Sequence, residues 1–353
     1  MSTSPVHYGL LSEQESDFAQ ACQQALAAGS DDPLAGGKDG WFGVGIAEEL
    51  GGSGGSMADV AVMIEEIGAA HAASLAGWQA GLVAPVLSRG GEAARALLER
   101  VCAGAVCVAI PVTPMTSWAA LDGDRDLTGD LIVLGSPACT HIPVPCIVAG
   151  IPSIAFVAAD HARIRATPLD LVDVTRPAMT VSLEGVPVGE ADAVVAHAKL
   201  LDEWLVSANL AAALDSTGLA RAVLIKTVDY AQKREQFGRL IGSFQAYKHR
   251  CATMYIEHKM AQSLAFRAAR SAGTDDGRLM ALAAGKLTTA SATFIAGEAM
   301  QLHGGMGFTW EGGVHQYLKR ARTNEVLARA DGYGRRLLLT EYRASRDASS
   351  DRQ

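Results

Sequence analysis

The sequence predicts an α+β fold in which an N-terminal helical domain, a small middle β-barrel or sandwich and a C-terminal four-helix bundle follow one another. Three observations along the 353 residues predict it. Apolar residues first recur at helical spacing, short β-rich runs separated by Pro, Gly and Asp follow, and long Ala-rich helical segments then return. We expect the three domains to span residues 1–104, 105–195 and 196–353.

The N-terminal part is expected to be entirely helical. Helical spacing runs from residue 10 to about residue 28, and Ser12 with Glu15 has the pattern of a capping box. The segment GGSGGS is a loop rather than a phosphate-binding loop, because no Gly-Lys-Ser/Thr follows it. Ser56 and Asp59 are positioned to cap the next helix. Further helices are predicted over 58–84 and 91–104.

The middle part contains the β-rich runs AVCVAIPV, DLIVLGS, PCIVAGI, SIAFVAAD, ARIRATPL and MTVSLEGVPV. Turn-forming residues interrupt them every eight to twelve residues, which is typical of a small antiparallel barrel or sandwich. The chain becomes helical again from His197, and the short connections between its four long helices predict a bundle. Its predicted helices cover 197–233, 242–272, 275–303, 314–329 and 332–346.

Composition excludes several functional classes. The net charge of −8 is spread along the chain without a basic stripe, so we expect no nucleic-acid partner. The longest uncharged run, residues 70–88, contains Gly, Ser, Gln, His and Pro and is a poor membrane span, and the N-terminus lacks the pattern of a signal peptide. Six cysteines without metal-ligand spacing predict reduced thiols, no metal site and a cytoplasmic protein.

Two stretches carry a resemblance to a known family. They are YAQKREQFGRLIGSFQAYKHRCATM, residues 230–254, and AMQLHGGMGFTWEGGVHQYLKRARTNEVL, residues 299–327. In this order, separated by two helices, they resemble the C-terminal domain of acyl-CoA dehydrogenases. Residues 45–70 are similar to the N-terminal helical region of that family, so the resemblance covers nearly the whole chain.

The resemblance implies FAD-dependent desaturation of an acyl-CoA thioester between its α and β carbons. In the family a carboxylate removes the α proton, and the β hydrogen leaves as hydride to FAD. Such chemistry needs a base near the α carbon and hydrogen-bond donors on the thioester carbonyl. An electron-transfer flavoprotein is the acceptor that the family commonly uses.

The family builds its FAD site from two subunits, and this chain matches the half that reaches into a neighbour's site. A guanidinium is a bidentate partner for a diphosphate, and glycine lets a backbone approach an anion closely. The residues so implied are Arg234 for the pyrophosphate, Gln236 and Phe237 beside it, Phe244 and Gln245 along the same surface, and Gln301, Gly304 and Gly305 near the adenosine.

The half that a subunit uses for its own flavin does not match. The family's TEPxAGSD-like segment is IPVTPMTSWAALDGD here, and only Thr113 and Pro114 agree with it in part. The two positions at which the family places its base are Ala328 and Ala208, which take no proton. The sequence therefore predicts no catalytic residue.

Two carboxylates near these positions are weak substitutes for the missing base, and Glu311 in the glycine loop and Asp331 after the expected turn are two further ones. Glu325 comes three residues before Ala328, and Glu203 comes five before Ala208. Each is more often a solvated acid or a helix cap.

This partial match resembles the non-catalytic subunit of bacterial heteromeric α2β2 acyl-CoA dehydrogenases, some of which act on CoA esters derived from steroid side chains or rings. A catalytic subunit of the same family is then the expected partner, with FAD at their interface. Two alternatives stay open. One is a self-sufficient homotetrameric dehydrogenase with a displaced base, and the other is a flavin-free scaffold or CoA-thioester-binding protein on the same fold.

Overall fold

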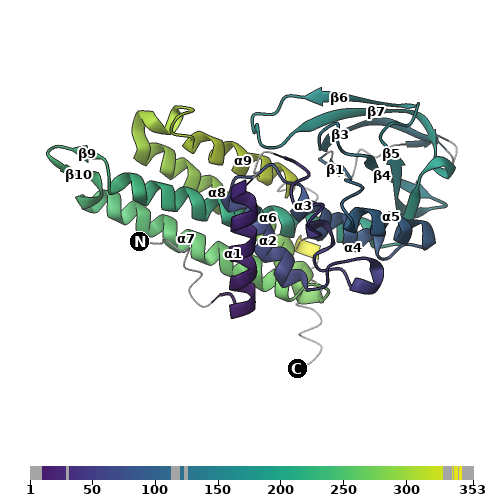
Figure 1. Cartoon of the computed structure of the whole chain (residues 1–353), viewed down its shortest axis with the longest axis horizontal. Coiled ribbons are helices and arrows are strands. Elements are labelled where there is room, and N and C mark those ends of the chain that lie inside the picture. Colours follow the sequence, from purple (N-terminus) through teal and green to yellow (C-terminus); the bar gives the residue numbers. More distant parts are fainter. Residues whose placement is uncertain are drawn as a thin grey trace.

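The computed structural model describes residues 10–28, 32–112, 120–122, 126–328, 336, 338–340 and 342–343. Helices, β strands and helices follow one another along the chain in the predicted order. Figure 1 shows the strands of the middle region gathered at one end of the molecule and the long helices extending to the other. The helix predicted over 332–346 lies largely outside the described residues.

The N-terminal helices are α1 (Glu13–Ala28), α2 (Met57–Ala69), α3 (Ala76–Trp78), α4 (Ala84–Leu87) and α5 (Glu92–Cys102), with a π-helical turn η3 (Gln79–Val83) between α3 and α4. Both predicted helix caps are confirmed. The backbone N–H of Ser12 donates to Glu15 at 2.7 Å, and Glu15 N–H donates back to the Ser12 hydroxyl at 3.2 Å. Ser56 and Asp59 form the same reciprocal pair at the start of α2.

The prediction of one continuous helix over 58–84 is wrong. Helix α2 ends in a Schellman motif, in which Ala72 N–H donates to Ile67 O and His71 N–H donates to Gly68 O. His71 occupies the left-handed position with φ 54°, which stops the helix. The chain resumes as α3, η3 and α4, and the Gln79 side chain bonds both the N–H and the C=O of Val108.

In the described part of the chain, the strands of the middle region form two antiparallel sheets. The first has the order β1-β3-β7-β6 with β2 also paired to β3, and the second has the order β4-β5-β8. The last strand was not among the predicted β-rich runs. The strands are β1 (Ile110–Pro111), β2 (Ala120–Asp122), β3 (Asp126–Leu134), β4 (His141–Val148), β5 (Ile151–Ala158), β6 (Ile164–Leu169), β7 (Ala178–Pro187) and β8 (Ala193–Ala196).

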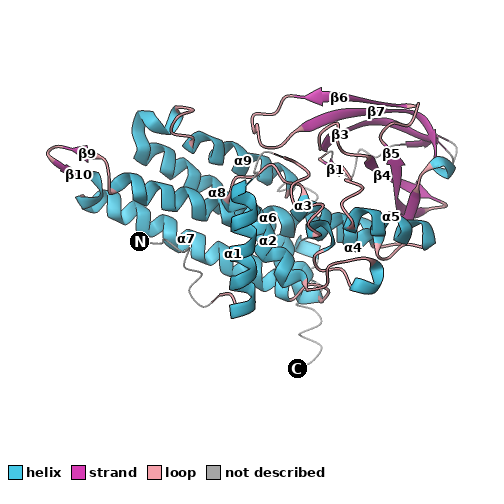
Figure 2. Ribbon diagram, viewed as in Figure 1, coloured by secondary structure: helices cyan, strands magenta, loops and turns pink. Residues whose placement is uncertain are grey.

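The C-terminal part consists of α6 (Leu200–Ala231), α7 (Gln245–Arg270), α8 (Asp275–His303) and α9 (Val314–Leu327), with a short hairpin β9 (Glu235–Gln236) and β10 (Arg239–Leu240) between α6 and α7. Helix α6 packs against the other three, and α8 packs against α7 and α9. By length and composition alone, the stretch 275–308 could cross a membrane, but half of its apolar window is buried inside the molecule. Figure 2 shows the helices and the strands β1 to β8 as separate parts.

Helices α2 and α6 approach each other closely at a pair of glycines. A Cβ atom on Gly68 would lie 2.2 Å from the Asp215 carbonyl oxygen, and one on Gly218 would lie 2.0 Å from the Glu65 carbonyl oxygen. This contact joins the N-terminal helices to the bundle. The element order confirms the predicted α+β fold class, while the domain limits at residues 104 and 195 remain predictions.

Candidate functional site

The first motif of the expected cofactor surface forms a projecting hairpin. Strands β9 and β10 pair in register, and Figure 1 shows the hairpin standing clear of the helices at the end of the molecule opposite the sheets. Phe237 at its tip has φ 54° and is 93% exposed, and Gly238 follows with φ 72°. Positive φ at both central residues gives the two-residue turn that suits the twist of a hairpin. The side chains of Arg234 and Gln236 are exposed beside it.

Aromatic and cationic side chains pack together at the base of the hairpin. The Phe237 and Phe244 rings meet edge to face with centroids 6.2 Å apart, and the Arg239 guanidinium lies 3.9 Å from the Phe244 ring centroid. Gln245 begins α7 next to them and is exposed. These contacts hold the Phe244 ring against Arg239, although the tip itself faces solvent.

The second motif comes to the same end of the bundle. His303, the last residue of α8, stacks on Tyr230 of α6 with ring centroids 4.5 Å apart, and its Nδ1 lies 2.8 Å from the Ala299 carbonyl oxygen. Arg234 follows Tyr230 by one turn and donates its N–H to the Tyr230 carbonyl at 2.9 Å. Gly304 directly follows His303. The Tyr230–His303 contact therefore brings the Arg234 and Gly304 segments into proximity.

The two glycines that follow α8 have open space at the position where a side chain would begin. Gly304 has φ 59°, and a Cβ atom placed on Gly304 or Gly305 would meet nothing within 4 Å. The preceding Gln301 is exposed. Uncovered glycine backbone and an exposed guanidinium each suit the approach of a diphosphate. The residues present therefore fit the pyrophosphate and adenosine half of FAD.

A groove of about 850 Å³ lies beside the Tyr230–His303 pair, and both residues line it. Helices α1, α2 and α6 and the loop after α8 line it, and Glu66 and Arg221 lie in it as an ion pair with N–O distance 2.8 Å. Sequence reasoning did not predict this groove. Its walls combine Leu26, Ala69 and Met306 with charged residues of both signs.

The two positions expected for a catalytic base are buried. Ala208 on α6 is 9% exposed and Ala328, just after α9, is 1% exposed, and both belong to one apolar core. The substitute carboxylates are already paired. Glu203 contacts Arg89 and lies 3.3 Å from His197 Nε2, and Glu325 accepts a hydrogen bond from Arg322 at 2.7 Å. Their roles remain predictions.

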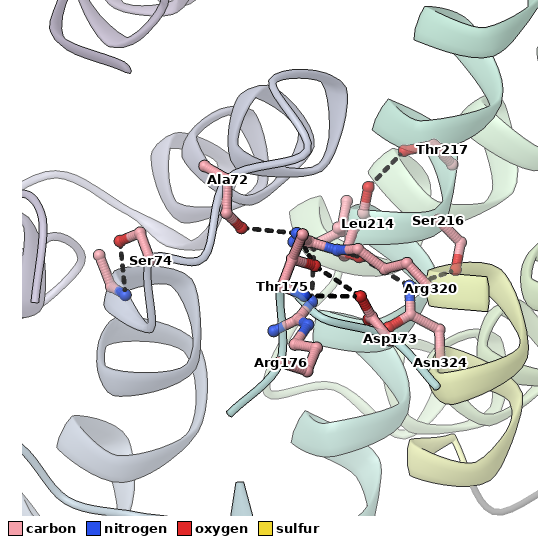
Figure 3. Close-up of polar contacts among 12 residues, drawn as sticks. Ala72, Ser74, Asp173, Thr175, Arg176, Leu214, Ser216, Thr217, Arg320 and Asn324 are labelled. Atoms are coloured by element: carbon pink, nitrogen blue, oxygen red, sulfur yellow. Dashed lines mark hydrogen bonds and ion pairs between the residues drawn. The ribbon is translucent and has the colours of Figure 1, made fainter. Parts of the chain in front are cut away.

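A buried ionic cluster lies one turn from Ala328 on the same face of α9. The Asp215 cluster consists of Asp215 on α6, Arg320 and Asn324 on α9, and Arg176 from the segment before β7. Arg320 Nε and Asn324 Nδ2 donate to Asp215 at 3.1 and 2.7 Å, and Arg176 lies 3.0 Å from the same carboxylate. Figure 3 shows Arg176, Arg320 and Asn324 converging from these separate segments.

Arg320 also ties the cluster to the N-terminal helices and the β part. It donates to the Ala72 carbonyl at 2.5 Å and to the Thr175 hydroxyl at 3.3 Å. Burial opposes charge on Asp215, but Arg320 and Arg176 together outweigh it and hold the pKa of Asp215 well below its usual range. The sequence offers one signal of the cluster, a lone Asp inside the apolar stretch NLAAALDSTGLA, but nothing in that stretch indicates its partners.

The segment expected to meet the flavin ring lies mostly outside the described residues, including Thr113 and Pro114. The described residues therefore include the expected cofactor-binding residues and both buried base positions.

Comparisons with known proteins place these features in context. The chain matches the domain families described as "Acyl-CoA dehydrogenase, N-terminal domain" over residues 34–105 and "Acyl-CoA dehydrogenase, C-terminal domain" over residues 203–338. It is 32% identical over 284 residues to acyl-CoA dehydrogenase IpdE2 of Mycobacterium tuberculosis, covering 80% of this chain and 77% of that protein. It is 33% identical over 285 residues to FadE34 of the same organism, covering 80% of this chain but only 38% of FadE34.

Solved structures share the fold at lower identity. A chain of the ChsE4-ChsE5 complex from Mycobacterium tuberculosis superposes with a TM-score of 0.83 at 22% identity, covering 94% of this chain and 98% of that one. A chain of the Tcur3481-Tcur3483 steroid ACAD G363A variant gives a TM-score of 0.76 at 23% identity, with 94% and 99% coverage.

Proposed function

This chain belongs to the acyl-CoA dehydrogenase family of FAD-dependent flavoproteins, and we propose that it acts there as a subunit that completes an FAD site without supplying the catalytic base. Members of the family are oxidoreductases that act on acyl-CoA thioesters. The proposal concerns how this chain takes part in that reaction: with a catalytic partner subunit of the same family, in an α2β2 assembly.

One observation carries the proposal. The residues that match the family's cofactor motifs lie together on an exposed end of the bundle, whereas both positions for a base are alanines inside the apolar core. A hairpin that stands clear of its own domain is suited to reach a site on another chain. Arg234 would pair with the pyrophosphate there, and Gln301, Gly304 and Gly305 would follow the adenosine.

The different roles of the two subunits follow from the chemistry of the reaction. FAD, when bound, accepts the hydride from the β carbon. Removal of the α proton needs a carboxylate within hydrogen-bond reach of that carbon. Ala208 and Ala328 provide none, so the partner subunit supplies the base. This chain contributes the charge and the open backbone that hold the cofactor at the interface.

The structural neighbours support a substrate class and an assembly. One of them is described as a steroid ACAD, and another comes from a complex of ChsE4 with ChsE5. We therefore propose a CoA ester derived from a steroid side chain or ring as the substrate. An electron-transfer flavoprotein is the proposed acceptor, and the proposed location is the cytoplasm.

The test is co-expression of this chain with the product of a neighbouring acyl-CoA dehydrogenase-like gene. The two chains should purify together with FAD, and a Gln in place of the partner's base should abolish turnover. A complex that holds no more flavin than either chain alone would count against the proposal.

Two other outcomes of the same experiment have separate meanings. Loss of turnover in Glu203→Gln or Glu325→Gln, with the partner's base intact, would indicate a displaced base on this chain. A complex without colour that still binds the CoA thioester would indicate a scaffold. We expect neither, because both carboxylates are already held by cationic side chains.

A further inference from the structure

Two buried cysteines lie in direct contact in the β part of the molecule. The sulfur atoms of Cys107 and Cys139 are 3.6 Å apart, and each residue is 3% exposed. All six cysteines lie in the described part of the chain and all are free thiols, but only these two have sulfur atoms in contact with each other.

The backbone already holds these two segments side by side. The Cys107 carbonyl accepts hydrogen bonds from the N–H groups of Thr140 at 2.8 Å and His141 at 3.3 Å, and Val108 pairs with His141 in a parallel bridge. A disulfide has an S–S distance near 2.05 Å, so the sulfur atoms would need to approach by about 1.5 Å. Side-chain rotation can supply much of that distance without separating the paired segments.

The two thiols are not equivalent. The hydrogen bond between the sulfurs lowers the pKa of Cys139 and raises that of Cys107, and a backbone hydrogen bond at Ser136 also favours a Cys139 thiolate. Burial raises the pKa of Cys102 and of Cys146 to about 11. Because the thiolate is the nucleophile, Cys139 is the best placed of these buried thiols to react.

Cys139 also lies beside exposed residues. It lies on the turn between β3 and β4, and its neighbours Pro137, Ala138 and Thr140 are exposed. Both residues are 3% exposed, but Cys107 lies in a run of buried residues, so an oxidant has the shorter stretch of buried chain to pass at Cys139.

We propose that Cys139 and Cys107 form a peroxide-sensitive modification site that closes to a reversible disulfide. The Cys139 thiolate attacks one oxygen of hydrogen peroxide, the O–O bond breaks, and the departing hydroxide takes a proton to become water. Cys139 is thereby oxidised to a sulfenic acid. Cys107 then attacks the Cys139 sulfur, the S–O bond breaks, and a second water leaves.

The balance is complete: two thiols lose two protons and two electrons, and one peroxide is reduced to two waters. A dithiol reductant reverses the change. The disulfide would link the segment that leads into β1 to the turn between β3 and β4. The link would lie next to Val108, whose backbone is hydrogen-bonded to the Gln79 side chain. This site depends neither on FAD nor on a partner subunit.

The experiment exposes the full chain to hydrogen peroxide, blocks the remaining thiols by alkylation and maps the peptides by mass spectrometry. We expect the Cys107–Cys139 peptide pair to appear with the loss of two hydrogen atoms, at least about ten-fold faster than oxidation of Cys102 or Cys146. Dithiothreitol should return both thiols.

Serine variants distinguish Cys139, which reacts with peroxide, from Cys107, which then forms the disulfide. Cys107→Ser should leave Cys139 as a sulfenic acid that dimedone traps, and Cys139→Ser should leave Cys107 unmodified at the same exposure. Cys102→Ser, which removes a solitary buried thiol, should leave the disulfide unchanged. The inference is overturned if wild-type Cys139 reacts no faster than Cys102, or if the linked peptides form only in denaturant.

Discussion

Arg320 of α9 donates hydrogen bonds to both carboxylate oxygens of Asp215 on α6, and both side chains are buried. Arg176, from the segment before β7, shares the same carboxylate. One acid thus holds together the bundle and the β part, while Arg320 reaches the N-terminal helices through the Ala72 carbonyl. The proposed partner surface therefore belongs to a bundle that this cluster connects to the other two parts of the molecule.

Asp215→Asn should therefore destabilise the chain strongly. The change removes one charge from a buried cluster and leaves two guanidinium groups poorly compensated, which costs about 3–5 kcal/mol. The measurement is urea unfolding followed by circular dichroism. Glu298→Gln is the control, because its pair with Arg250 is partly exposed and should be worth less than about 1 kcal/mol. Equal effects of the two changes would show that the cluster contributes no special stability.

Gly218→Ala should disturb the contact between α2 and α6. The added Cβ would lie 2.0 Å from the Glu65 carbonyl oxygen, which forces the helices apart at a cost of about 1–3 kcal/mol. Gly297→Ala is the matched control in α8, where a Cβ meets nothing within 4 Å and should stabilise the helix by about 0.5–1 kcal/mol. Thermal melting of both variants checks the opposite signs. A neutral Gly218→Ala would contradict the close helix contact.

His71 should make the folded state sensitive to mild acid. Burial first, and then Arg320, lower its pKa to about 4, although Asp173 and Asp215 oppose that shift. Below pH 6.5, the ordinary pKa of histidine, His71 is protonated in the unfolded state but stays neutral in the folded state. The free energy of unfolding is therefore unaffected by His71 above pH 6.5 and decreases as the pH falls toward 4.

The comparison is with His71→Asn, because asparagine tolerates the left-handed backbone at φ 54°. Denaturant unfolding at several pH values should show a wild-type loss on the order of 2 kcal/mol from this group, absent in the variant. Identical pH profiles would mean that His71 does not titrate in this way. Other buried histidines contribute equally to both proteins and cancel in the difference.

Arg234→Ala should lower the FAD content of the complex with the partner subunit. Loss of a charge-assisted bond to the pyrophosphate costs about 1.5–3 kcal/mol, or roughly ten-fold or more in affinity. Flavin absorbance per mole of complex at limiting FAD is the readout. The control is Arg165→Ala, which removes an exposed arginine of β6 paired with Glu184. An unchanged flavin content in Arg234→Ala would remove Arg234 from the cofactor surface.

Local patterns predict much of this architecture, and long-range contacts account for what they miss. The capping residues Ser12 and Ser56 act within one helical turn, so the sequence is enough to find them. The break at His71 depends on a backbone conformation that helical periodicity does not reveal. The Asp215 cluster joins residues more than one hundred positions apart, and no spacing along the chain reports that contact.

The cofactor surface shows the same contrast. Short sequence patterns identify the motifs around Arg234 and Gly304, but their proximity depends on the stacking of Tyr230 on His303. The spacing of the cysteines predicts scattered thiols, because Cys107 and Cys139 meet only through the pairing of two segments of the β part.

The most direct measurement is the turnover of the purified lone chain, supplied with excess FAD, an acyl-CoA substrate and an artificial electron acceptor, beside that of the complex with its partner. Ala208 and Ala328 offer no proton acceptor, so the lone chain should be inactive while the complex is active. Full turnover by the lone chain with stoichiometric flavin would contradict its assignment as a base-lacking subunit.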